Sequence, residues 1–188
     1  GKQLLNGLVH LPLILPPVVT GYLLLLTFGR RAPLGGWLYD TFGLVLAFRW
    51  TGAALAAGIM GFPLMVRAIR LAIEAVDPKL EQAAATLGAS RAWVFATITL
   101  PLILPGIIAG AVLGFAKAMG EFGATITFVS NIPGQTQTLP SAIYRLLHVL
   151  REETSALKLV ALSVTLAMGA LLLSELLARR AAKRVSGA

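Results

Sequence analysis

The sequence contains no cysteine and only two histidines, His10 and His148. Without cysteine the chain cannot form a disulfide, a thiolate metal site or a cysteine nucleophile. The two histidines are far apart in the sequence, and neither has an acid or hydroxyl at the spacing of a catalytic triad. We therefore expect no catalytic residues and no metal site.

A phosphate-binding loop is also missing. Its motif, G-x-x-x-x-G-K-[ST], requires a Gly-Lys pair, and the only such pair is Gly1 and Lys2. We expect this chain to carry no cofactor, so any ATP and Mg used by the system would be bound by another polypeptide.

Charged residues are few, at 13%, whereas 57% of the residues are apolar and the mean hydropathy is +0.82. A soluble domain has about a quarter charged residues, so this composition indicates a membrane protein. Sixteen basic residues outnumber eight acidic ones. They lie between long uncharged runs, which is typical of anchoring to anionic membrane lipid and does not favour a nucleic-acid partner.

Four stretches are long enough, or nearly so, to cross the hydrocarbon core, which takes roughly 20 helical residues. They are residues 3–29, 50–66, 92–116 and 158–178. The sequence thus predicts an all-α, polytopic bundle with four spanning helices in a single transmembrane domain, residues 1–188. An even number of spans places both ends of the chain on the same side of the membrane.

The distribution of lysine and arginine predicts which side that is. Nine basic residues fall on the side of the termini and of the loop that follows Arg67; six, Arg151 among them, fall on the other side. Because basic residues favour the cytoplasm, we expect both ends and this loop to be cytoplasmic.

Proline and glycine interrupt the apolar stretches. Residues 11–21 read LPLILPPVVTG and residues 100–110 read LPLILPGIIAG, identical at the first six positions. This echo fits either an internal repeat of a transporter or coincidence in a small apolar alphabet. In both cases the prolines remove backbone donors, which favours a bundle with a pathway over a simple anchor.

The cytoplasmic loop, residues 74–101, predicts two helices joined by a glycine elbow. Asp77 can cap a helix over residues 78–87, Gly88 can end it, and Ser90 can cap a second helix running toward Pro101. Helical spacing gives the first helix a flat apolar stripe of Leu80, Ala83, Ala84 and Leu87. Such a face favours a protein partner; the alternative is a helix lying in the membrane interface.

The order Gln82, Ala83, Ala84, three residues, Gly88, nine residues, Ile98, one residue, Leu100 and Pro101 resembles the EAA loop of ABC importer permeases. In that family the loop docks on the ATPase subunit. Gln82 stands where the family has glutamate, and Glu81 precedes it. The resemblance implies coupling residues at Glu81, Gln82, Ala83, Ala84, Gly88, Ala89, Ile98, Leu100 and Pro101.

The segment after the third span is rich in small polar residues. Neutral hydroxyl and amide donors suit an oxyanion that must be held weakly and released, although threonine and serine also cap helices and bond within bundles. Lys117 and Glu121 are four residues apart and can pair on one helical face, which we interpret as structural. The candidate pathway residues are Lys117, Glu121, Thr125, Thr127, Ser130 and Asn131.

Residues 120–144, GEFGATITFVSNIPGQTQTLPSAIY, are very similar to the matching segment of molybdate ABC transporter permeases. That family has a five-helix core, which implies that its first helix precedes Gly1. Its partners would be two ATPase subunits, a second permease copy forming a homodimer, and an extracytoplasmic molybdate-binding protein. Tungstate or sulfate/thiosulfate transport is an alternative, and a non-transporting membrane scaffold or enzyme subunit is an alternative of another class.

Overall fold

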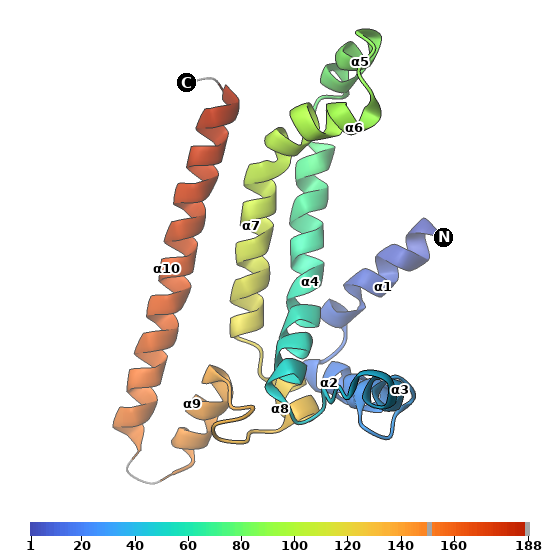
Figure 1. Cartoon of the computed structure of the whole chain (residues 1–188). Helices are drawn as coiled ribbons and strands as arrows, with labels where there is room; N and C mark the ends of the chain where they lie inside the picture. Colours follow the sequence, from blue (N-terminus) through green and yellow to red (C-terminus); the bar gives the residue numbers. More distant parts are fainter. Residues whose placement is uncertain (150–151, 187–188) are drawn as a thin grey trace. The chain divides into compact units, whose positions relative to one another are not determined.

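The computed structural model describes residues 1–149 and 152–186, and within them the chain is built entirely from helices (Figure 1). Arg151 lies outside the described residues. The helices are α1 (Lys2–Ile14), α2 (Pro17–Phe28), α3 (Pro33–Phe42), α4 (Trp50–Glu74), α5 (Pro78–Thr86), α6 (Arg91–Val94), the short π-helix η1 (Phe95–Thr99), α7 (Leu100–Met119), α8 (Gly123–Val129), α9 (Leu139–Leu147) and α10 (Glu153–Ser186). The predicted all-α class is confirmed.

Three stretches of helix are long and apolar enough to cross a membrane. They are Trp50–Glu74, Arg91–Met119 and Glu153–Arg180, and they contain the last three predicted spans. The first predicted span is instead a pair of helices, Gln3–Ile14 and Pro17–Phe28, bent by 116°. It is therefore a broken span or a re-entrant loop and not the continuous helix that its lack of charge suggested.

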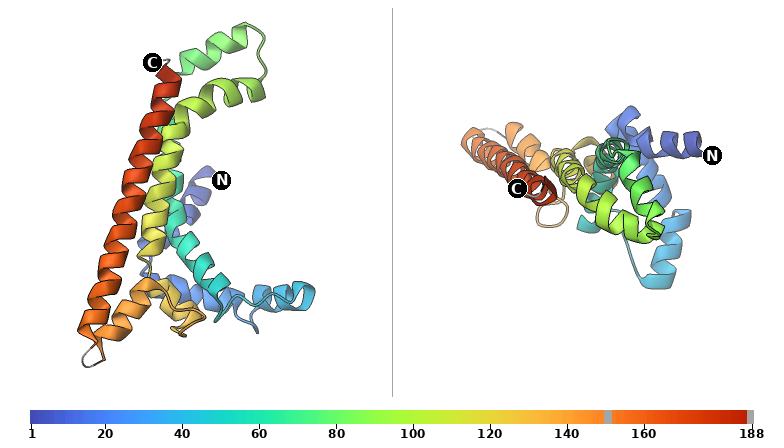
Figure 2. Two further views of the ribbon diagram at one scale, coloured as in Figure 1. Left: turned by 60° about the vertical axis from the view of Figure 1, so that its left-hand side comes forward. Right: turned by 90° about the horizontal axis from the view of Figure 1, so that it is seen from above.

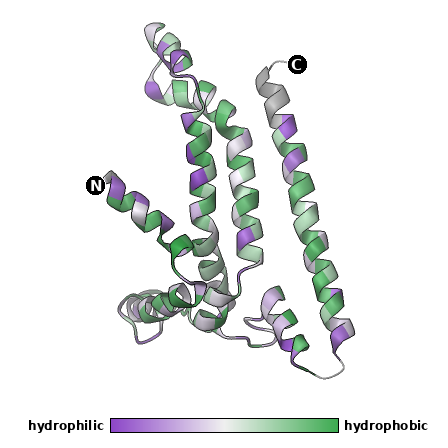
Figure 3. Ribbon diagram, turned by 180° about the vertical axis from the view of Figure 1, so that it is seen from behind, coloured by the Kyte–Doolittle hydropathy of each residue, from purple (hydrophilic) through white to green (hydrophobic). Residues whose placement is uncertain are grey.

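Apolar residues predominate along these spans (Figure 3), and many of their large side chains are exposed. On α10, for example, Leu171, Leu172 and Leu173 are each more than half exposed. Soluble proteins rarely leave so large an apolar surface open, so lipid or another subunit must cover it.

The chain forms two compact units. The first comprises Gly1–Pro63 and Gly114–Ala167; the second comprises Leu64–Leu113 and the chain from Met168 onward. Helices α4, α7 and α10 each contribute residues to both units.

The core of the first unit lies where α2, α4 and α8 meet. Phe128 and Val129 of α8 are fully buried and cluster with Leu24 of α2 and with Ala56 and Met60 of α4. This packing holds the short helix α8 in place although it has only seven residues.

Glycine allows α2 and α8 to approach closely. A Cβ atom on Gly21 would lie 2.5 Å from the backbone oxygen of Ala124, and one on Gly123 would lie 2.8 Å from Cβ of Pro17. Side chains at these two positions would push the helices apart, so the sequence selects glycine for packing.

In the second unit, α7 packs against α4 and leads to the helical elbow. A Cβ atom on Gly110 would lie 3.1 Å from Cβ of Ala68, and one on Gly106 would meet Cβ of Ala72. Beyond this contact α5 and α6 form the two arms of the elbow, as two views show (Figures 1 and 2). The connection between them, residues 87–90, contains Gly88.

Candidate functional site

The predicted elbow between α5 and α6 is present, and its capping residues act as expected. Oδ1 of Asp77 accepts the backbone N–H of Lys79 at 2.9 Å, and Oγ of Ser90 accepts the N–H of Trp93 at 3.3 Å. Gly88 has φ +84°, a left-handed conformation that other residues rarely adopt. These contacts confirm the helix, glycine elbow and second helix read from the sequence.

The second helix passes through Pro101 without a break, as the predicted span over residues 92–116 requires. It runs from α6 through η1 into α7, and the helical stretch continues to Met119. Pro101 stands just after the π-helix, where the N–H of Leu100 bonds to the oxygen of Phe95, five residues back. Single π-turns are rare and often occur at functional sites.

Glu81 has an intramolecular partner. Oγ1 of Thr99 in η1 donates a hydrogen bond of 2.6 Å to Oε1 of Glu81 in α5, and Thr99 is 5% exposed. The bond closes the elbow across eighteen residues, so it fixes α5 on the start of α7. Gln82, by contrast, is exposed. The geometry thus gives the acid an internal role and leaves Gln82 available to a partner.

An apolar groove of about 660 Å³ lies between the arms of the elbow. Its lining comes from α5, the elbow and the α6–η1 arm: Leu80, Ala83, Ala84, Leu87, Gly88, Ala89, Ser90, Trp93 and Ile98. Five of the nine predicted coupling residues therefore come together here, namely Ala83, Ala84, Gly88, Ala89 and Ile98. Leu100 and Pro101 begin α7 beyond the π-turn.

The stripe predicted on α5 is not uniformly accessible. Leu87 is 88% exposed and Ala83 is exposed, whereas Ala84 is only 8% exposed. The oxygen of Ala84 also accepts the N–H groups of Leu87 and Ala89 at 3.2 Å. Ala84 thus supports the elbow from within, and docking through it remains a prediction.

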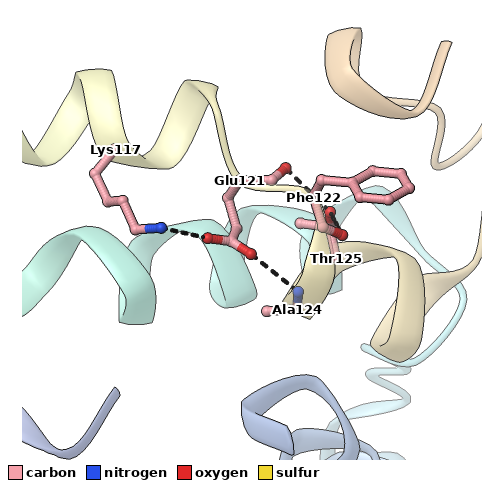
Figure 4. Close-up of polar contacts among 5 residues, drawn as sticks. All are labelled: Lys117, Glu121, Phe122, Ala124 and Thr125. Carbon is pink, nitrogen blue, oxygen red and sulfur yellow. Dashed lines mark hydrogen bonds and ion pairs between the residues drawn. The ribbon is translucent and has the colours of Figure 1, made fainter. Parts of the chain in front are cut away.

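The second predicted cluster lies at the junction of α7 and α8 (Figure 4). Nζ of Lys117 lies 2.9 Å from Oε2 of Glu121, whose side chain is 1% exposed. The other carboxylate oxygen accepts the N–H of Ala124 at 2.9 Å. The pair forms as predicted, but the helix does not continue: α7 ends at Met119, and Glu121 joins its end to the first turn of α8.

The two threonine hydroxyls proposed for an anion pathway donate to backbone oxygens. Oγ1 of Thr125 donates to the oxygen of Phe122 at 2.9 Å, and Oγ1 of Thr127 donates to that of Gly123 at 2.8 Å. Such bonds within a helix are common for threonine. Ser130 is exposed and has φ +64°, so it ends α8 in an unusual backbone conformation.

Asn131 organises the loop after α8. Its Nδ2 donates to the oxygen of Ser141 at 3.3 Å, and its Oδ1 accepts from Gln137 at 3.1 Å and from the Ser141 hydroxyl at 3.2 Å. Thr138 and Ser141 form a capping box at the start of α9. Asn131 therefore holds loop and helix together, and its assignment to a pathway remains a prediction.

Sequence reasoning did not identify Thr99. It occupies the position between Ile98 and Leu100 at which the resemblance motif specifies no residue, and its partner Glu81 belongs to another helix, so no periodicity connects the two. A threonine followed directly by a long apolar stretch gives no signal of its own.

Residues 1–186 match the family described as binding-protein-dependent transport system inner membrane component. The molybdenum transport system permease protein ModB of Escherichia coli K12 is 63% identical over 184 residues, which cover 98% of this chain and 80% of the relative. ModB of Haemophilus influenzae is 55% identical over 98% of the chain and 81% of its own length.

A sulfate transporter subunit is less similar. The sulfate transport system permease protein CysT of Escherichia coli K12 is 35% identical over 144 residues, 77% of this chain and 52% of its own. All three relatives are permease proteins by name, and none is named as an enzyme. With its membrane-spanning helices and a family match over nearly its whole length, this chain belongs to the inner-membrane components of binding-protein-dependent transport systems and is a transport subunit, not an enzyme.

Proposed function

We propose that this chain is the permease subunit of an ATP-driven importer that moves molybdate across the cytoplasmic membrane. The observation that carries the proposal is the 63% identity, over 98% of the chain, to a permease named for molybdenum transport. The sulfate relative reaches 35% over 77% of the chain. Tungstate is chemically so close to molybdate that only a direct measurement separates the two.

In this proposal two copies of the permease pair with two ATPase subunits and receive the anion from an extracytoplasmic binding protein. ATP and Mg are bound by the ATPases. Helix α5 docks on the ATPase, and the Glu81–Thr99 bond passes its movement to η1 and α7. At the other end of α7, Glu121 is bonded to Ala124 of α8. Alternating access then follows from a rigid-body movement of these helices.

The substrate is tested with the complex reconstituted in lipid vesicles. We expect ATP hydrolysis to rise when the binding protein is loaded with molybdate and to stay near its basal rate with sulfate. Tungstate should act like molybdate if the binding protein does the selecting. Stimulation by sulfate alone would favour the sulfate alternative. A membrane scaffold or enzyme subunit would give no stimulation by any loaded binding protein.

Docking through α5 is tested with Ala83→Glu, because Ala83 is exposed and lines the groove whereas Ala84 is buried in the elbow. A charge at a close-packed interface is desolvated, so we expect the ATPase to be lost on co-purification. Ala92→Glu is the matched control, since Ala92 is exposed near the start of α6, where an acid suits the helix. If the ATPase co-purified normally with Ala83→Glu, this face of α5 would contact lipid or the permease itself and not the ATPase.

The cytoplasmic position of the termini and of the elbow is part of the proposal. The chain has no cysteine, so single cysteines report accessibility without background. Leu87→Cys, at the exposed elbow, should react with an impermeant thiol reagent only in opened cells. Gln135→Cys, exposed in the loop between α8 and α9, should react in intact cells. The reverse pattern would invert the topology.

A further inference from the structure

Thr20 of α2 carries a buried hydroxyl with no partner. Its side chain is 6% exposed, and Oγ1 is the one buried side-chain polar atom without a hydrogen bond in the part of the chain that the structure describes. Leaving a buried donor unpaired costs stability, so such a group calls for a physical reason.

The local backbone explains why the hydroxyl does not bond within its own helix. In α2 the hydroxyl of Thr27 donates to the oxygen of Leu23, four residues back, at 2.7 Å. The equivalent oxygen for Thr20 is that of Pro16, which already accepts the N–H groups of Val19 at 2.9 Å and of Thr20 itself at 3.2 Å. Two donors fill the two lone pairs of a carbonyl oxygen. The hydroxyl of Thr20 therefore finds no free acceptor at the start of α2, where Pro16 is the N-cap residue.

The position of Thr20 places it on the face of α2 that packs against α8. Helical spacing puts it in one stripe with Pro17, Gly21 and Leu24. Gly21 is in close contact with α8, and Leu24 belongs to the same buried cluster as Phe128. Thr20 therefore lies beside the helix that carries the candidate anion-pathway hydroxyls.

The pathway hydroxyls differ from Thr20 in one respect. Thr125 and Thr127 donate to backbone oxygens of their own helix. Their donors are in use. Thr20 alone among these offers a buried neutral donor, which a tetrahedral oxyanion can accept without the trapping effect of a fixed positive charge.

We propose that Thr20 donates a hydrogen bond to the tetrahedral oxyanion as it passes, at the stage when α2 and α8 separate. The inference rests on the proposed function, because it takes the transported group to be an oxyanion. Valine has nearly the shape of threonine and would fill the buried site without an unpaired donor. The unpaired hydroxyl is therefore costly while α2 and α8 are in contact, and the anion would supply the acceptor that it lacks.

The test compares Thr20→Val with Thr20→Ser, and uses Thr27→Val as the matched control on the same helix. Each permease is purified with its ATPase, and molybdate uptake into vesicles, basal ATP hydrolysis and thermal stability are measured. Loss of one hydrogen bond to a charged group corresponds to a fall in uptake of roughly tenfold for Thr20→Val. Its stability and basal hydrolysis should be unchanged or higher, Thr20→Ser should retain most uptake, and Thr27→Val should match the wild type.

Two results would overturn the inference. Wild-type uptake by Thr20→Val would mean that the hydroxyl meets only water or nothing. Reduced uptake with an equal loss of stability, repeated in Thr20→Ala, would give the hydroxyl a structural role. Failure of the wild-type complex to take up molybdate would instead refute the proposed function, so the two failures are distinguishable.

Discussion

Residues 11–16 and 100–105 have the same sequence, LPLILP, but they fold differently. In the first segment α1 ends before Leu15, and α2 begins at Pro17 after a bend of 116°. In the second segment α7 continues through Pro105 to Met119. Six identical residues therefore do not determine whether a helix breaks.

The difference lies in the next residue, Pro17 in one segment and Gly106 in the other. A residue that precedes proline is pushed out of the helical region into extended backbone. Pro16 therefore adopts ψ 135°, and Leu15, which precedes Pro16, adopts ψ 143°. Two successive restrictions end the helix, whereas α7 absorbs the single proline at 105.

Gly106→Pro should transfer the break to the second segment and is expected to have the largest effect. It removes a helical hydrogen bond in α7, pushes Pro105 toward extended backbone and places a ring against Ala72. A proline in a helix interior costs about 3 kcal/mol or more. Thermal unfolding in detergent measures the effect, with Pro105→Ala as a control expected to keep the helix. An unchanged unfolding temperature for Gly106→Pro would show that paired prolines do not cause the break.

Each segment is followed, five residues after its last proline, by a glycine that allows close packing: Gly21 after the first and Gly110 after the second. The two glycines differ in how close the neighbouring atoms lie. A Cβ atom on Gly21 would lie 2.5 Å from a backbone oxygen, and one on Gly110 would lie 3.1 Å from Cβ of Ala68 and from the oxygen of Met65. Overpacking costs about 1–3 kcal/mol, so Gly21→Ala should reach the upper end and Gly110→Ala the lower. Gly58→Ala, where nothing lies within 4 Å, is the control. Equal losses at Gly21 and Gly110 would contradict the ranking.

Sequence reasoning was most successful where a local rule decides the structure. Asp77, Gly88 and Ser90 mark the elbow because capping and positive φ depend on single residues. The Lys117–Glu121 pair was expected from its spacing of four residues, and it forms although Glu121 lies just beyond the end of α7. The family was also recognisable, since the spacing of the coupling motif is preserved.

The sequence was least informative where two distant segments decide the structure. The Glu81–Thr99 bond and the burial of Ala84 depend on how the two arms of the elbow meet. The burial of Thr20 depends on the packing of α2 against α8, a helix far along the chain, whereas its missing partner follows from the backbone at Pro16. The bend at Pro16 was hidden because an uncharged stretch reads as one span whether or not it is broken.

The residue just before the segment is His10 in the first case and Thr99 in the second. The variant Thr99→Val tests whether the hydroxyl of Thr99 matters for coupling. Thr99 bonds to Glu81 in another helix, whereas His10 bonds to the oxygen of Asn6 in its own helix. Removing the hydroxyl should cost about 1 kcal/mol and reduce stimulation of ATP hydrolysis several-fold while the ATPase still co-purifies. Thr97→Val is the control, because its hydroxyl bonds only to Trp93 one turn back. Equal effects of Thr97→Val and Thr99→Val would show that the Glu81–Thr99 hydrogen bond has no specific role in coupling.

The smallest effect is expected for Ala109→Thr, which gives the second segment the threonine of the first. Ala109 is exposed on α7, and an exchange at an exposed helical position usually changes stability by about 0.5 kcal/mol or less. The new hydroxyl can bond to the backbone oxygen one turn back, so it creates no unpaired donor. Uptake and unfolding temperature should both match the wild type. If Ala109→Thr altered uptake as strongly as Thr20→Val, the two positions would be functionally equivalent, and the echo would be an internal repeat with a shared role instead of two apolar segments adapted to different neighbours.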